Sequence, residues 1–213
     1  MRPPPAARVW VNVQGDPIQS FPENAGAMVL PWLSLFPGSL VPLHIFEDRY
    51  RLMVKNALAS HRMFAIAHAD DGERCEPFGG LGVIRACVSN DDGTSNLVLQ
   101  GVARVEFGDF EMEPFPRAEI RILSDAADNE ATARTMRSKV TKACLDALRN
   151  GFEAPKGFAD YIESVSPEGA FADIVASAMV SDPVQRRTLL LERNVAARLE
   201  LLHTLIRERI EAA

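Results

Sequence analysis

Two pairs of adjacent carboxylates and one serine–lysine pair are the side chains whose types and spacing suggest catalysis in this sequence. The carboxylate pairs are Asp70-Asp71 and Asp91-Asp92, and a glycine follows each of them. Adjacent acidic residues before a glycine are typical of solvated turns. Ser138 and Lys139 are neighbours in a helical pattern, where consecutive side chains do not face each other. No nucleophile, base and orienting group can be assembled from these residues, so we expect that the protein is not an enzyme.

The sequence also contains no complete motif for binding a cofactor or a metal ion. The segment Gly79–Arg85 resembles a dinucleotide-binding loop, but arginine stands where the third glycine is needed and the residues after it favour a strand. The sequence has no G-x-x-x-x-G-K-[ST] loop, no G-x-S-x-G elbow and no H-E-x-x-H pair. Its three cysteines form no C-x-x-C pair, which fits reduced thiols in a cytoplasmic protein. We expect neither a cofactor nor a metal ion.

The charge distribution argues against a nucleic-acid partner. The chain has 23 basic and 29 acidic residues and a net charge of −6. Residues 29–126 contain nine basic and fourteen acidic residues, and neither flanking part is basic. A surface that binds phosphates needs clustered positive charge, so we expect no nucleic acid. No apolar run is long enough to span a membrane, and Met1–Pro5 is not followed by the apolar stretch of a secretory signal.

The 213 residues suffice for one large domain or two small ones. Residues 1–27 form a proline-rich arm, in which Val9–Val13 alternates apolar and polar residues. This stretch is either a short edge strand or part of a flexible tail. The sequence therefore predicts an arm at 1–27 followed by folded parts.

Residues 29–123 favour strands and one helix. The apolar run Val29–Phe36 ends at Pro37-Gly38, and Leu40–Phe46 resumes it as a strand that Pro42 restricts to an edge or irregular position. Apolar residues at helical spacing over 50–58 predict a helix. Further strands are expected at 63–67 and 81–84, then a hairpin of 96–100 with 102–107, and a half-buried strand at 117–122.

After Ser124 the apolar period is helical throughout. One stripe runs through residues 136–148 and ends at Asn150-Gly151, a typical helix stop. Further helices are expected to begin near Ser166-Pro167, Ser181-Asp182 and Asn194. Strands followed by helices, rather than alternating with them, indicate an α+β protein with segregated parts.

The segment Phe36–Arg51 carries the most specific pattern, F-P-G-S-L-V-P-L-H-I-F-E-D-R-Y-R. It joins a turn, a strand and a helix start, and Glu47 places a carboxylate near the first helical amides. His44 fits a packed, hydrogen-bonded side chain, and Arg49 and Arg51 fit a solvated helix face. From chemistry alone, the segment is structural.

This segment closely resembles the amino-terminal domain of the Lon ATP-dependent proteases, whose pattern is L-F-P-G-x-x-x-P-L-H-I-F-E-x-R-Y. The order of later segments agrees: 92–105 is similar to the family's D-G-T…G-x-x-R segment, 115–120 to its next strand, and 185–199 to its closing helices. The resemblance implies a PUA-like β pseudo-barrel at 28–124 followed by a helical bundle at 125–213. It also implies a polypeptide-binding part that stands alone, without the ATPase and the peptidase. PUA domains often bind RNA, but the acidic charge argues against that property here.

On this resemblance we expect a non-catalytic module that binds unfolded or partly folded polypeptides by an apolar surface or by strand addition near Leu40–Phe46. The alternatives are an adaptor that binds a protease or regulatory partner through the arm and the helices, and a hydrolase of unrecognised type. The chain is expected to be a monomer or a weak homodimer. The candidate binding residues are Phe36, Leu40, Leu43 and Phe46. The family-motif residues are Pro37, Gly38, Pro42, His44, Glu47, Arg49, Tyr50, Gly101 and Arg104.

Overall fold

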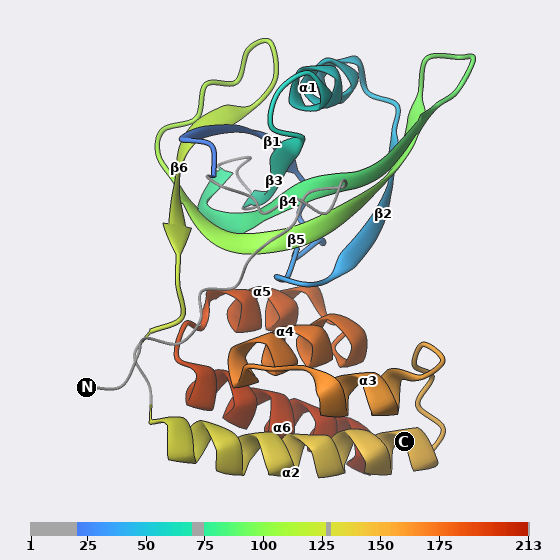
Figure 1. Ribbon diagram of the computed structural model, residues 1–213, viewed down its shortest axis with the longest axis vertical. Helices are drawn as coiled ribbons and strands as arrows, with labels where there is room; N and C mark the ends of the chain where they lie inside the picture. The colour runs from blue at the N-terminus through green and yellow to red at the C-terminus, as the bar shows by residue number, and fades with distance from the viewer. Residues whose placement is uncertain (1–20, 70–74, 127–128, 213) are drawn as a thin grey trace.

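The computed structural model describes residues 21–69, 75–126 and 129–212. A curled sheet with one short helix at its far end lies above a bundle of helices, and the described chain enters the bundle after β6 (Figure 1). The strands are β1 Asn24–Val29, β2 Leu40–Ile45, β3 Met63–Ala69, β4 Cys75–Ser89, β5 Ser95–Phe107 and β6 Arg117–Leu123. The helices are α1 Asp48–Leu58, α2 Glu130–Arg149, α3 Phe158–Ser164, α4 Glu168–Met179, α5 Pro183–Leu191 and α6 Val195–Glu211.

The six described strands follow the order β2-β5-β4-β3-β1-β6, and β6 also pairs with β5. The sheet therefore closes into a barrel from β5 round to β6. Only β1 and β3 are parallel. The long strand β5 pairs with β2 over Ser95–Gln100 and with β6 over Arg104–Phe107. Because β2 pairs with β5 alone, its other edge is free within the described residues.

Side-chain caps set the starts of the long helices. Asn129 accepts hydrogen bonds from the amides of Ala131 and Thr132 before α2, and Asn194 accepts one from Ala197 at 2.8 Å before α6. Asp182 caps α5, whose first residue is Pro183. In the described part of the chain, no helix is long and apolar enough to cross a membrane.

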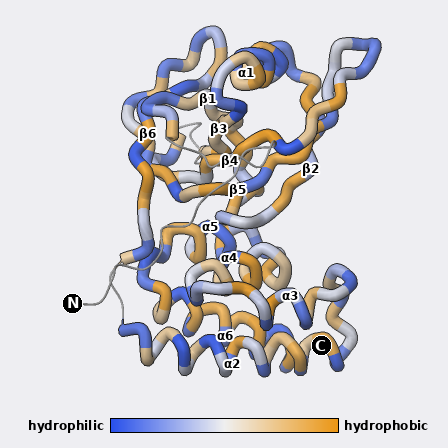
Figure 2. The backbone as a smooth tube through the Cα atoms, viewed as in Figure 1, coloured by the Kyte–Doolittle hydropathy of each residue, from blue (hydrophilic) through white to orange (hydrophobic). Residues whose placement is uncertain are grey.

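The two bodies contain three apolar cores. Small residues such as Ala65 and Ala103 fill the barrel interior. A second core lies between the sheet and α1, which contributes Tyr50 and Met53. The third lies among the helices. Figure 2 shows hydrophobic stretches along β4 and β5 and on the helices of the lower body.

The predicted α+β class, with strands followed by helices, is confirmed. Three details differ from the expectation. β5 is one continuous strand where we expected a hairpin turning at Gly101, because that glycine makes room for another segment of the chain (below). The apolar run Val29–Phe36 contributes only its first residue to β1, and the rest forms a connection. β1 begins at Asn24, inside the expected arm.

One helix was not expected from the sequence. The apolar pattern did not predict the short helix α3. Val9–Val13, for which an edge strand and a flexible tail were both considered, and the turn at Asp70-Asp71 fall outside the described residues.

Candidate functional site

The first half of the family segment is buried between the barrel and the helices. Phe36 has no exposed surface and belongs to the helical core, although it precedes β2 of the barrel. The guanidinium of Arg186 lies 5.3 Å from the centre of its ring, and the pKa of Arg186 is lowered by burial. A Cβ atom on Gly101 would lie 2.1 Å from the carbonyl oxygen of Phe36, so only glycine fits there. This half of the segment connects the barrel to the helices inside the molecule, and we call this contact region the joint.

A buried cluster of charges reinforces the same joint. Arg104 donates from Nε to the carbonyl of Leu190 at 2.6 Å and from Nη1 to Asp173 at 3.0 Å. Arg198, fully buried on α6, donates from Nη2 to Asp125 at 3.0 Å, and its Nε lies 3.4 Å from Asp173. These pairs link β5 and the chain after β6 to three helices. The motif residue Arg104 is therefore a connecting residue, not a binding residue.

Ser34 and His68 form a serine–histidine contact at this joint, with Oγ and Nε2 3.3 Å apart. Burial, and after it the charge of Arg187, lowers the pKa of His68. Both side chains are almost fully buried, so a substrate cannot reach them. Among the described residues, no group of three or more His, Cys, Asp and Glu side chains is placed to hold a metal ion.

The second half of the segment forms the exposed edge strand β2. The carbonyl of Ser39 accepts a hydrogen bond from the amide of Gly101 at 2.9 Å, so the main chain of Ser39 faces β5. In an antiparallel pair this orientation alternates along the strand. The main-chain groups of Leu40, Pro42 and His44 therefore point away from β5, at the free edge. Leu40 is 62% exposed.

An apolar pocket of about 310 Å³ runs along this edge, between β2, the connection from β1 and the start of α1. Two large aromatic side chains border it: Trp32 is 63% exposed and Phe46 is 62% exposed. Its remaining lining includes Leu33, Leu43 and the buried Tyr50, whose hydroxyl accepts a hydrogen bond from the amide of Val29. Exposed aromatic side chains beside an apolar hollow are typical of an interaction surface.

Two polar side chains that line this pocket are hydrogen-bonded to nearby side chains of the barrel body. Nδ1 of His44 lies 2.9 Å from Oδ1 of Asn96 on β5. Glu47 accepts a hydrogen bond from Nε of Arg49 at 2.9 Å. The pocket therefore presents apolar side chains next to free main-chain groups, and its lining residues bring no nucleophile and base together.

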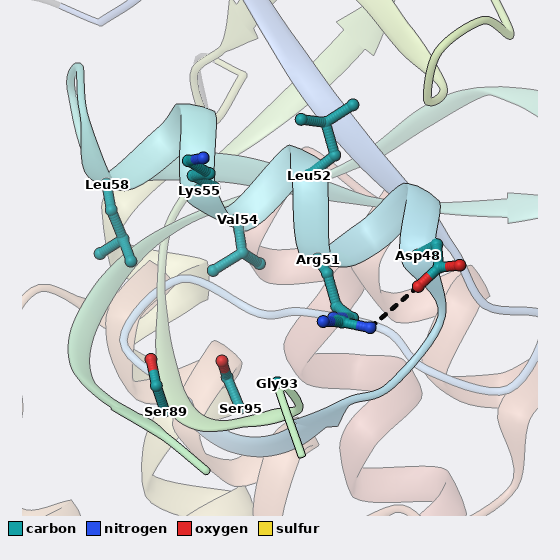
Figure 3. A pocket seen from close by; sticks show the side chains of 9 residues that line it. All are labelled: Asp48, Arg51, Leu52, Val54, Lys55, Leu58, Ser89, Gly93 and Ser95. Atoms are coloured by element: carbon teal, nitrogen blue, oxygen red, sulfur yellow. Dashed lines mark hydrogen bonds and ion pairs between the residues drawn. The ribbon is translucent and has the colours of Figure 1, made fainter. Parts of the chain in front are cut away.

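A larger hollow, about 480 Å³, lies between α1 and the β4–β5 turn (Figure 3). Arg51 points into it, donates to Asp48 at 2.9 Å, and lies directly against Gly93. Lys55 lines the same hollow, together with two serines. Leu52, Val54 and Leu58 complete a mixed lining, and the charge of Arg51 is already paired with Asp48.

The structure divides the sequence-based candidates between the two regions. Leu43 and Phe46 line the pocket and Leu40 lies beside it on the same edge, whereas Phe36 is buried and cannot contact a bound chain. Trp32 and Leu33 were missed, because the apolar run Val29–Phe36 was interpreted as part of a strand-rich region; Pro31, which disfavours a central strand, was the available signal. The pocket also takes in Pro42, His44, Glu47 and Tyr50, and Arg49 is bonded to it through Glu47. The joint takes in Pro37, Gly38, Gly101 and Arg104.

Comparison with known proteins supports the same architecture. The fold matches the N-terminal domain of the Mycobacterium avium complex Lon protease, with a TM-score of 0.73 at 21% identity, over 87% of this chain and 98% of that one. It also matches a Lon N-terminal domain protein from Xanthomonas campestris, with a TM-score of 0.60 at 19% identity, over 84% and 96% of the two chains. At these identities, the likeness shows the fold.

The sequence is similar to complete Lon proteases over one part of their length. It is 22% identical to the Lon protease of Desulfosudis oleivorans over 199 residues, which cover 89% of this chain and 24% of that protein. It is 23% identical to Lon protease 2 of Myxococcus xanthus, over 86% of this chain and 24% of the relative. The chain thus spans about a quarter of these relatives.

Residues 27–208 match the family described as the ATP-dependent protease La (LON) substrate-binding domain. This range begins within β1 and includes nearly all of α6, so both bodies take part in the match. The chain belongs to the Lon substrate-binding domain family.

Proposed function

We propose that this chain is a non-catalytic module that binds exposed apolar segments of unfolded or partly folded polypeptides. One observation carries the proposal: Trp32 and Phe46 both line an apolar pocket and remain largely exposed, beside a sheet edge that is free within the described residues. The family's description as a substrate-binding domain supports it. The relatives are Lon proteases, so the bound chain would be a substrate of proteolysis.

The affinity of such a pocket is expected to be modest. Burying one large apolar side chain contributes about 1.5–3 kcal/mol, and association itself costs several kcal/mol. One or two side chains in the pocket therefore give weak binding unless further contacts add to it. We expect dissociation constants in the range of about ten to a hundred micromolar for a single segment.

The test is binding of a permanently unfolded protein, reduced and carboxymethylated lactalbumin, measured by fluorescence anisotropy. The double variant Trp32→Ser with Phe46→Ser removes both aromatic borders and is expected to weaken binding at least about tenfold. Val184→Ser is the matched control, because Val184 is a 70% exposed apolar residue on α5, away from the pocket lining. It should bind as the wild type does.

Circular dichroism and urea unfolding check that each variant is folded. Two results contradict the proposal: no binding by the wild-type chain at about a hundred micromolar, or equal binding by the wild type and the double variant.

A further inference from the structure

The free edge of β2 carries main-chain groups that can recognise an extended chain. On the basis of the proposed function, we infer that the bound segment is added to β2 as an extra strand, and that Pro42 reserves this edge for foreign segments by disfavouring the pairing of two copies of this chain. The substrate class is then an extended segment with apolar residues at alternate positions.

The edge offers two amide donors and three carbonyl acceptors. Leu40 and His44 each present an N–H and a carbonyl, whereas Pro42 presents a carbonyl alone because its nitrogen carries no hydrogen. Within the described residues, no other segment forms a main-chain hydrogen bond with these groups. An added strand can therefore form its ladder here without displacing a neighbour.

The pocket lies where such a strand would place its side chains. Consecutive residues of β2, from Val41 to Ile45, line it, although neighbouring residues of a strand point to opposite faces. A hollow that contacts both kinds of residue must run along the edge itself. Residues of an added strand that lie opposite Val41 and Leu43 share their face of the sheet, so every second side chain meets the apolar lining.

A second copy of the chain is a poorer occupant of this edge. Two antiparallel β2 edges centred on Pro42 bring the two prolines opposite each other, and neither supplies a donor to the facing carbonyl. Such a pair loses two ladder hydrogen bonds, and registers shifted by one residue pair also meet proline. A foreign strand with an amide hydrogen at every position loses only one. Proline on an edge strand is a recognised device against edge-to-edge association.

The first arm of the experiment uses a short synthetic peptide with isoleucine at alternate positions, and measures its anisotropy on binding. Two N-methylated versions remove the amide hydrogens of one alternate set or of the other. Because only one set faces β2, methylation of that set is expected to weaken binding at least about tenfold, while the other set binds nearly as the parent does. Equal behaviour of the two versions would overturn strand addition.

The second arm uses Pro42→Ala, which restores one donor to the edge. We expect it to bind the parent peptide about two- to tenfold more tightly, as one net hydrogen bond predicts, and to show a higher dimer fraction in sedimentation velocity. Pro183→Ala, an exposed proline at the start of α5, is the control and should change neither property. Unchanged or weaker peptide binding by folded Pro42→Ala contradicts the role given to Pro42, and so does an unchanged dimer fraction.

The two proposals fail separately. If the wild-type chain does not bind carboxymethylated lactalbumin, the proposed function itself is wrong. If it binds in a manner that depends on Trp32 and Phe46 but ignores N-methylation, the pocket binds side chains without strand addition, and only the present inference is wrong.

Discussion

The two halves of the family segment use apolar residues for opposite purposes. Phe36, in the first half, is fully buried among the helices, while Phe46, ten residues later, is 62% exposed beside the β2 edge. Both are phenylalanines in one continuous motif. The difference lies in what surrounds them: the joint supplies Arg186 and a glycine on the facing strand, whereas the edge supplies no described segment to cover Phe46.

The ion pairs also differ between the two regions: they are buried at the joint and exposed at the β2 edge. Arg104 and Asp173 are paired with both side chains almost fully buried, and the arginine also bonds to a carbonyl of α5. Glu47 and Arg49 are paired with about half of the arginine side chain exposed. A buried pair is costly to break, whereas an exposed pair contributes little. We infer that the joint is a rigid support, and that the edge is the part available to a partner.

The largest expected effect concerns the buried pair at the joint. Arg104→Ala leaves Asp173 buried with only the more distant Arg198 as a charged partner, so the free energy of unfolding should fall by about 3–5 kcal/mol. Urea unfolding measures it. Arg121→Ala is the control, because its ion pair with Glu106 is exposed, and the expected loss is less than about 1 kcal/mol. Similar losses in both variants would erase the contrast between buried and exposed charges.

A smaller loss in the free energy of unfolding is expected from Gly101→Ala, which adds a methyl group against Phe36. The Cβ atom of Gly101→Ala would lie 2.1 Å from the carbonyl oxygen of Phe36, so the segment must shift, at a cost of about 1–3 kcal/mol. Gly108→Ala is the matched control, since its nearest contact would be an ordinary 3.6 Å and the expected change is within about 0.5 kcal/mol. If Gly101→Ala unfolds at the same urea concentration as the wild type, the joint is looser than the contacts indicate.

The smallest expected effect is a pH dependence that arises at the joint. Burial lowers the pKa of His68 from its usual 6.5 in the folded chain, so below that pH the unfolded chain binds a proton that the folded chain does not. The free energy of unfolding should therefore fall as the pH drops from about 7.5 to about 5.5. His68→Gln should reduce this fall in urea titrations. Part of it will remain, because burial also lowers the pKa of His61. An unchanged slope in His68→Gln would show that His68 titrates as it does in water.

Local patterns predicted most of the elements correctly. The apolar period placed α1, the proline and asparagine signals placed the starts of α4, α5 and α6, and strict alternation placed β6. Sequence reasoning failed at Gly101, where a glycine inside a strand was interpreted as a turn. The reason is that its requirement comes from Phe36, a residue 65 positions away, and no local pattern records such a contact.

The sequence predicted where the candidate site lies, but not all of the residues that line it. Pro42 alone indicates an edge strand, because proline cannot donate within a central ladder, and the structure places β2 at that edge. The exposure of Trp32 was missed, since the composition of an apolar run does not distinguish a strand from a surface connection, and Pro31 indicates only that the run is not a central strand.

The sequence by itself determined the α+β order, the starts of α4, α5 and α6, an edge or irregular position for Pro42, and the family-specific segment. Only the tertiary structure decided which apolar residues of that segment serve the core and which remain outside it. Burial depends on partners brought together from distant parts of the chain, here Arg186 from α5 and Gly101 from β5. Phe36 has such partners, and Phe46 is left at the surface, where a foreign chain can meet it.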